Sequence, residues 1–80
     1  MSFFSRARLN EEADGFEGEA KRADAAALDG ERAAKDPNLD AYTQGVASRA
    51  AAIARSNARE YRHIAGELRA GEIPDCLDLS

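Results

Sequence analysis

The sequence predicts an all-α protein, and three observations lead to that expectation. Alanine, the strongest helix former, supplies 18 of the 80 residues, while β-branched residues are scarce. Proline occurs only at positions 37 and 74, so long segments contain no residue that breaks a helix. Small and apolar residues recur at alternating steps of four and three residues, which is the period of an amphipathic helix. We therefore expect an antiparallel helical hairpin.

The first helix is predicted over residues 10–34. Asn10 is a suitable N-cap, and the acidic residues that follow it suit the positive end of the helix dipole. Gly30 is a candidate for an earlier end. A narrow stripe of mostly small residues follows the helical period, which would let a partner helix approach closely. Its members are Leu9, Ala13, Phe16, Ala20, Ala23, Ala27, Gly30 and Ala34.

A turn is predicted over 35–37 and a second helix over 37–70. Asp36 is expected as the N-cap with Pro37 at the first helical position, and Gly71 followed by Ile73-Pro74 is typical of a helix stop. Residues 71–80 are expected to form a tail. The predicted apolar stripe of this helix consists of Leu39, Tyr42, Val46, Ala50, Ile53, Asn57, Tyr61, Ile64 and Leu68. A buried Asn57 would fix the register or the oligomeric state.

The predicted helices differ in length, at about 37 Å and about 51 Å for a rise of 1.5 Å per residue. Leu, Ile, Val and Phe together number only 13, so one hairpin buries little bulky apolar surface. We expect two hairpins to dimerise into a four-helix bundle, with Phe3 and Phe4 at its end. An N-terminal extension of the first helix through Phe3 and Phe4 would also relieve the difference in length. The alternative is a three-helix monomer in which the second helix breaks near Gly45.

Charge and composition exclude several classes of function. The formal net charge is −4, which argues against direct, general nucleic-acid binding and suits a partner with a basic surface. No apolar run is long enough to span a membrane, and the N-terminus lacks the apolar core of a secretory signal. Cys76 is the only cysteine, so a reducing, cytoplasmic setting is the expected location. With one histidine and no catalytic motif, we expect no enzyme activity and no cofactor.

Two charged surfaces are candidates for partner binding. Carboxylates spaced along a helix can imitate a phosphate backbone and occupy a basic groove. The acidic candidates are Glu11, Glu12, Asp14 and Glu17. A line of arginines on the second helix would instead dock an acidic partner, and it is predicted to lie opposite the apolar stripe. The arginine candidates are Arg55, Arg59, Arg62 and Arg69.

A metal site is the remaining chemical candidate. Glu60-x-x-His63 places a carboxylate and an imidazole on adjacent turns, with Glu67 four residues beyond His63. The stretch from Asn57 to His63 resembles the metal-binding helix of encapsulated ferritin-like proteins. That resemblance implies dimerising hairpins and a glutamate of the first helix as a further ligand. Surface pairing at spacings of three and four residues explains the same pattern without a metal.

These observations favour a non-enzymatic protein-interaction module. In size, acidity and lack of catalytic groups, the chain resembles small phage-encoded inhibitors such as anti-CRISPR proteins. That resemblance implies that the acidic helix occupies a basic nucleic-acid-binding surface of a host effector complex, which is a protein or ribonucleoprotein. The alternatives are a dimeric metal-binding bundle and a binder of acidic partners through the arginines.

Overall fold

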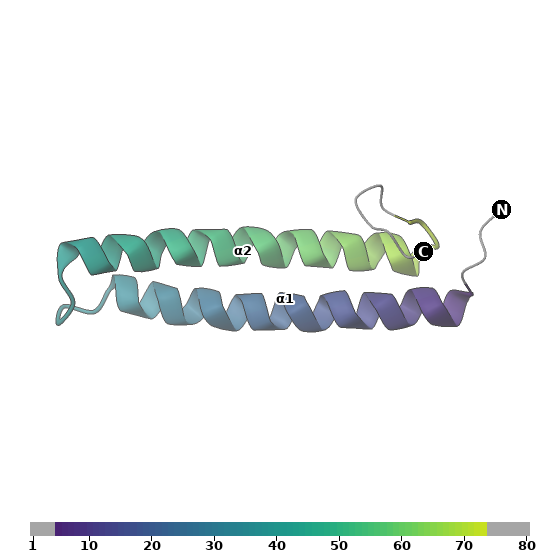
Figure 1. Ribbon diagram of the computed structural model, residues 1–80, viewed down its shortest axis with the longest axis horizontal. Coiled ribbons are helices and arrows are strands. Elements are labelled where there is room, and N and C mark those ends of the chain that lie inside the picture. The colour runs from purple at the N-terminus through teal and green to yellow at the C-terminus, as the bar shows by residue number, and fades with distance from the viewer. Residues whose placement is uncertain (1–4, 74–80) are drawn as a thin grey trace.

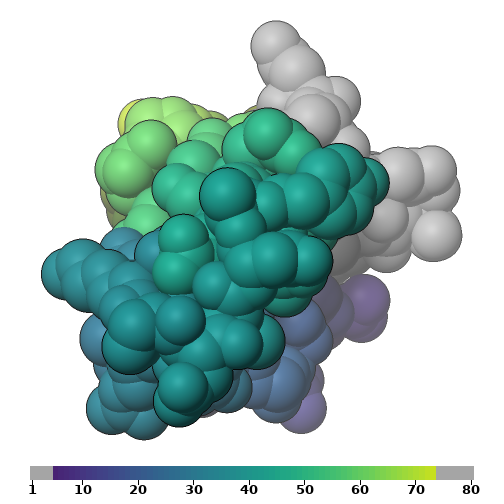
Figure 2. Space-filling view, turned by 90° about the vertical axis from the view of Figure 1, so that its left-hand side faces the viewer, coloured from purple at the N-terminus to yellow at the C-terminus, as the bar shows by residue number. Residues whose placement is uncertain are grey.

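The computed structural model describes residues 5–73, and they form two antiparallel helices joined by a short turn (Figure 1). Helix α1 spans Arg6–Ala34 and helix α2 spans Ala41–Arg69, with 29 residues each. The molecule is a rod of 56 × 18 × 17 Å, and a space-filling view along it looks onto the turn, with atoms of α2 above those of α1 (Figure 2). The predicted all-α hairpin is confirmed. The three-helix alternative is wrong, because α2 runs through Gly45 without a break.

Helix α1 begins four residues earlier than predicted. Its N-cap is Ser5, whose hydroxyl accepts a hydrogen bond from the backbone N–H of Arg8 at 3.1 Å. The prediction of Asn10 as the cap is wrong, since Asn10 lies inside the helix. The additional turn carries Leu9 into the contact with α2, where it is buried. This extension and the later start of α2 together remove the mismatch between the two predicted lengths.

The turn is longer than predicted, because α2 is capped by Asp40 and not by Asp36. The carboxylate of Asp40 accepts a hydrogen bond from the backbone N–H of Thr43 at 2.7 Å, and the bonds to Thr43 lower the pKa of Asp40. Asp36 instead stabilises the turn, since its carboxylate accepts the backbone N–H of Asn38 at 2.9 Å. Pro37 therefore belongs to the turn, and the prediction that it opens the helix is wrong.

The predicted stop at Gly71 is confirmed. Gly71 has a φ of +84°, a left-handed conformation that glycine adopts without strain. The backbone N–H of Glu72 reaches back to the carbonyl of Glu67 at 2.8 Å, which closes the last turn. Phe3, Phe4 and Cys76, and the tail from position 74, lie outside the described residues.

The contact between the helices, here called the seam, is built mainly from small side chains. The predicted stripe of α1 is confirmed where Leu9, Ala13, Ala20 and Ala27 are buried. On α2, however, the seam residues are mainly alanines. The buried residues of that helix are Ala51, Ala58, Ile64, Ala65 and Leu68.

The stripe predicted for α2 is wrong over the half of the helix nearest the turn. Tyr42, Val46 and Ile53 are exposed to 76%, 42% and 63%, and Asn57 is exposed as well. Alanines one residue further along the chain occupy the seam in their place. The predicted and observed stripes meet only near Ile64 and Leu68, at the open end of the hairpin.

Bulky side chains pack together only at that open end. Leu9, Ile64 and Leu68 form the core cluster with two alanines, and Phe16 packs against it. The rings of Phe16 and Tyr61 lie 6.1 Å apart between centroids, within the range of a favourable aromatic pair. Toward the turn, the seam depends on close backbone approach.

Gly30 shows how close that approach is. A Cβ added there would lie 2.9 Å from the carbonyl oxygen of Ala47 and 3.0 Å from the Cβ of Ala51. Gly30 thus does not end α1, as its sequence position suggested, but lies inside the helix and lets α2 pack against its backbone.

We expect Gly30→Ala to lower the free energy of unfolding by about 1–2 kcal/mol. The added methyl group must push the helices apart, and this cost exceeds the helix-propensity gain of up to ~1 kcal/mol. Urea unfolding followed by circular dichroism measures the change. Gly66→Ala is the matched control, because nothing lies within 4 Å of its added Cβ. That variant should be as stable as the wild type or more stable, and equal gains in both variants would contradict the tight seam.

Candidate interaction surfaces

One side of the hairpin carries a ladder of ion pairs, here called the arginine flank. Three arginines of α2, seven residues apart, face carboxylates of α1. Arg55 donates to Glu31 at 2.8 Å and to Asp24 at 3.3 Å. Its members are Arg55, Arg62 and Arg69 on α2, with Asp14, Glu17, Asp24 and Glu31 on α1.

Arg62 and Arg69 form similar ion pairs further along the hairpin. Arg62 also bonds to Asp24, so this carboxylate bridges two arginines. Arg69 donates to Glu17 at 2.9 Å and to Asp14 at 2.5 Å. The arginines of α2 and the acidic residues of α1 are both spaced seven residues apart. Because the two helices are antiparallel, each arginine lies opposite an acidic residue.

The hydrogen bonds from the arginines shift the ionisation of the ladder. The bond from Arg69 lowers the pKa of Glu17, and that from Arg62 lowers the pKa of Asp24. The bond from Arg55 lowers the pKa of Glu31. Both partners in each pair are therefore held in their charged forms.

The arginine flank contains most of the charged residues that the sequence marks as candidates for partner binding. In the structure these residues form ion pairs with one another. Arg55, Arg62 and Arg69 were expected opposite the apolar stripe, and they do lie on the other side of α2 from Tyr42, Val46 and Ile53. Because that stripe does not face α1, the arginines border the seam. At about 100° per residue they lie roughly 50° from the centre of the alanine seam. Arg59 is the exception, since its side chain is exposed and bonds to no other residue within 5–73.

The acidic candidates are likewise divided. Asp14 and Glu17 bind Arg69, and Glu12 pairs with Arg8 at 3.2 Å along α1. Glu11 is exposed and has no bonding partner in the described part of the chain. Sequence reasoning missed Asp24 and Glu31 as ladder residues, although the spacing of seven residues from Glu17 to Asp24 to Glu31 is a signal that could have found them.

The metal candidates do not form a cluster. Nε2 of His63 lies 2.5 Å from Oε1 of Glu67, while Glu60 is exposed and joins neither. Between Ser5 and Ile73, no group of three His, Cys, Asp or Glu side chains is placed to hold a metal ion. The observed pair matches the surface pairing that the spacing also predicted.

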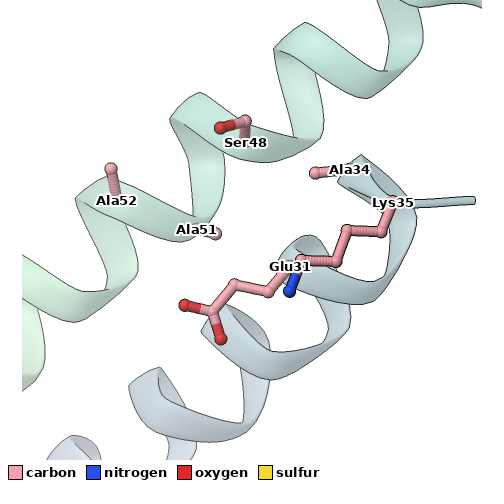
Figure 3. Close-up of a pocket in the computed structure, with 6 residues that line it drawn as sticks. All are labelled: Glu31, Ala34, Lys35, Ser48, Ala51 and Ala52. Atoms are coloured by element: carbon pink, nitrogen blue, oxygen red, sulfur yellow. The ribbon is translucent and has the colours of Figure 1, made fainter.

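A shallow groove of about 290 Å³ lies between the helices near the turn (Figure 3). Ala34, Ala51 and Ala52 line it with Ser48, and Glu31 and Lys35 border it along α1. The carboxylate of Glu31 is already bonded to Arg55. The ammonium group of Lys35 interacts electrostatically with the same carboxylate. The groove therefore follows from small side chains near the seam.

The other side of α2 is apolar and uncovered by the described residues. Tyr42, Val46, Ala50 and Ile53, here called the outer stripe, are all exposed. At about 100° per residue, this stripe lies roughly 110° from the alanine seam, in the direction away from the arginine flank. The hairpin is thus two-sided, with charge pairs on one flank and apolar side chains on the other. Neither helix is long and apolar enough to cross a membrane.

We expect low pH to lower the stability of the hairpin, because the carboxylates of the arginine flank become protonated. The pKa values of Glu17, Asp24 and Glu31 lie below the ordinary 4.5 for Glu and 3.8 for Asp. A lowered pKa in the folded state means that the stabilisation is complete above the ordinary value and is lost as the pH falls through the lowered one. We expect thermal unfolding, followed by circular dichroism, to shift to lower temperature below about pH 4.5.

Arg55→Gln tests whether the ladder causes that shift. It removes the partner of Glu31 and one partner of Asp24, so the melting temperature should fall at neutral pH and depend less on acid. Arg59→Gln is the matched control and should behave like the wild type. An unchanged acid dependence in Arg55→Gln would assign the effect to other carboxylates.

Comparison with known proteins gives no match: no family model, no curated protein and no solved structure is significantly similar to this chain. The function is therefore argued from the surfaces of the hairpin itself.

Proposed function

We propose that the chain is a non-enzymatic protein-interaction module that binds through the outer stripe of α2. The observation that carries this proposal is the exposure of Tyr42, Val46 and Ile53 on one side of a regular helix. Full burial of such side chains is worth about 1.5–3 kcal/mol each. A partner that covered the stripe would therefore gain a substantial part of a binding free energy from these residues.

The composition of the outer stripe also fits a contact surface. Interface centres are enriched in tyrosine and depleted of charge, and the rim around them is polar. The outer stripe has this arrangement, since Tyr42, Val46 and Ile53 are flanked by the exposed Arg49 and Ser56. Because α2 is held along its length by the seam, little chain entropy is lost when a partner docks.

The narrower proposal is that α1 acts as an acidic inhibitor of a basic surface. The net charge of −4 and the exposed Glu11 support it. Asp14 and Glu17 give it less support, because both already form ion pairs with Arg69. Docking an acidic partner on the arginines would require breaking the same ladder. The outer stripe needs no such rearrangement, so we favour it as the contact surface.

Site-specific photo-crosslinking tests the proposal. We replace Ile53 with p-benzoylphenylalanine, express the chain in the cells that naturally produce it and irradiate them. A covalent adduct of defined mass is expected from position 53. The same replacement at Arg59, which is exposed on the same helix but away from the outer stripe, should give little adduct.

A second substitution checks that the apolar stripe forms the contact. Val46→Asp, added to the chain labelled at position 53, should abolish the adduct, because a charge buried in an interface is costly. Ala52→Asp is the matched control on another face of α2 and should leave the adduct intact. No adduct from position 53, or equal adducts from positions 53 and 59, would refute the proposed function.

A further inference from the structure

We propose that the partner of the outer stripe is a second copy of this chain, with the two α2 helices antiparallel in a four-helix bundle. This inference rests on the proposed function, because it takes the outer stripe as a contact surface. It adds the identity of the occupant and the direction in which it binds.

The position of the two stripes on α2 fits a helix at the corner of such a bundle. The seam with Ala51 and Ala58 meets α1, and the outer stripe with Val46 and Ile53 lies roughly 110° away. In a four-helix bundle each helix packs against two neighbours in nearly perpendicular directions. One of these directions on α2 is already occupied, and the outer stripe supplies the second.

Charge determines the direction of the pairing. Arg49 and Glu60 are exposed, and neither side chain has a hydrogen bond or ion pair within residues 5–73. They are eleven residues apart, about three helical turns, so they lie along the same edge of the outer stripe. In an antiparallel pair of α2 helices, Arg49 of each copy can face Glu60 of the other. In a parallel pair, each would face its own like charge.

This pairing places the two-fold axis between positions 54 and 55, beside Ile53. The two copies of Ile53 then meet near the axis, in the middle of the interface. Val46 and Tyr42 of one copy extend toward the region around position 64 of the other, at the open end of its hairpin. An isologous contact of this kind is self-complementary, as a two-fold dimer requires.

Sedimentation equilibrium of the purified chain over a concentration series tests the inference. We expect a mass of twice 8.6 kDa at high concentration, with reversible dissociation on dilution. Ile53→Ser should raise the dissociation constant of the dimer about tenfold or more, since it removes a central apolar contact from both copies. Circular dichroism checks that the variant keeps its helices, which is expected because Ile53 lies outside the seam.

Charge reversal tests the antiparallel direction separately. Arg49→Glu should weaken the dimer by about tenfold, because it sets two glutamates against each other at both ends. Combining it with Glu60→Arg should restore the affinity of the wild type. Arg59→Glu is the control for the change in net charge and should have a smaller effect.

A mass of 8.6 kDa at every concentration, or a dimer unaffected by Ile53→Ser, overturns the inference. If Ile53→Ser weakens the dimer but Glu60→Arg does not rescue Arg49→Glu, the antiparallel arrangement is overturned. If the chain is monomeric and position 53 crosslinks to a different protein, the proposed function survives while this inference fails.

Discussion

The structure depends on the close approach of two helices whose facing side chains are mostly methyl groups. Ala13, Ala20 and Ala27 of α1 are buried, as are Ala51 and Ala58 of α2. Each methyl group buries little area, so the stabilisation is spread along the rod. Such a seam tolerates no extra volume where the backbones are closest, and for this reason a glycine stands at position 30, opposite Ala47 and Ala51.

An alanine seam is poorly specific by itself, because one methyl group fits against another almost as well. The arginine flank adds the specificity that the seam lacks. Arg55 reaches both Asp24 and Glu31, which fixes the rotation of α2 about its own axis relative to α1. Bidentate pairs hold geometry better than single contacts, even where their exposed position limits their contribution to stability.

The hairpin and the stripe of α1 were predictable because helical propensity and period agree there. The stripe of α2 was not predictable, because an alanine stripe and a stripe of bulkier side chains both follow the helical period on this helix. The bulkier stripe is the more hydrophobic of the two, but the alanine stripe packs against α1. Hydrophobicity alone favours Val46 and Ile53 over alanine, whereas the partner helix favours small side chains. The caps failed for a similar reason: Ser5 and Asn10 are both good caps, and the packing of Leu9 decides between them.

The exposure of the outer stripe is a consequence of the ladder and the seam together. Turning α2 by roughly 110° to bury Val46 and Ile53 would carry Arg55 away from its carboxylates on α1. It would also bring bulky side chains toward Gly30, where even a single Cβ has no room. The hairpin therefore cannot bury this stripe against α1 without losing its ion pairs and its close contact. A partner that covers the stripe, as proposed above, would therefore leave the seam and the ion pairs of the hairpin intact.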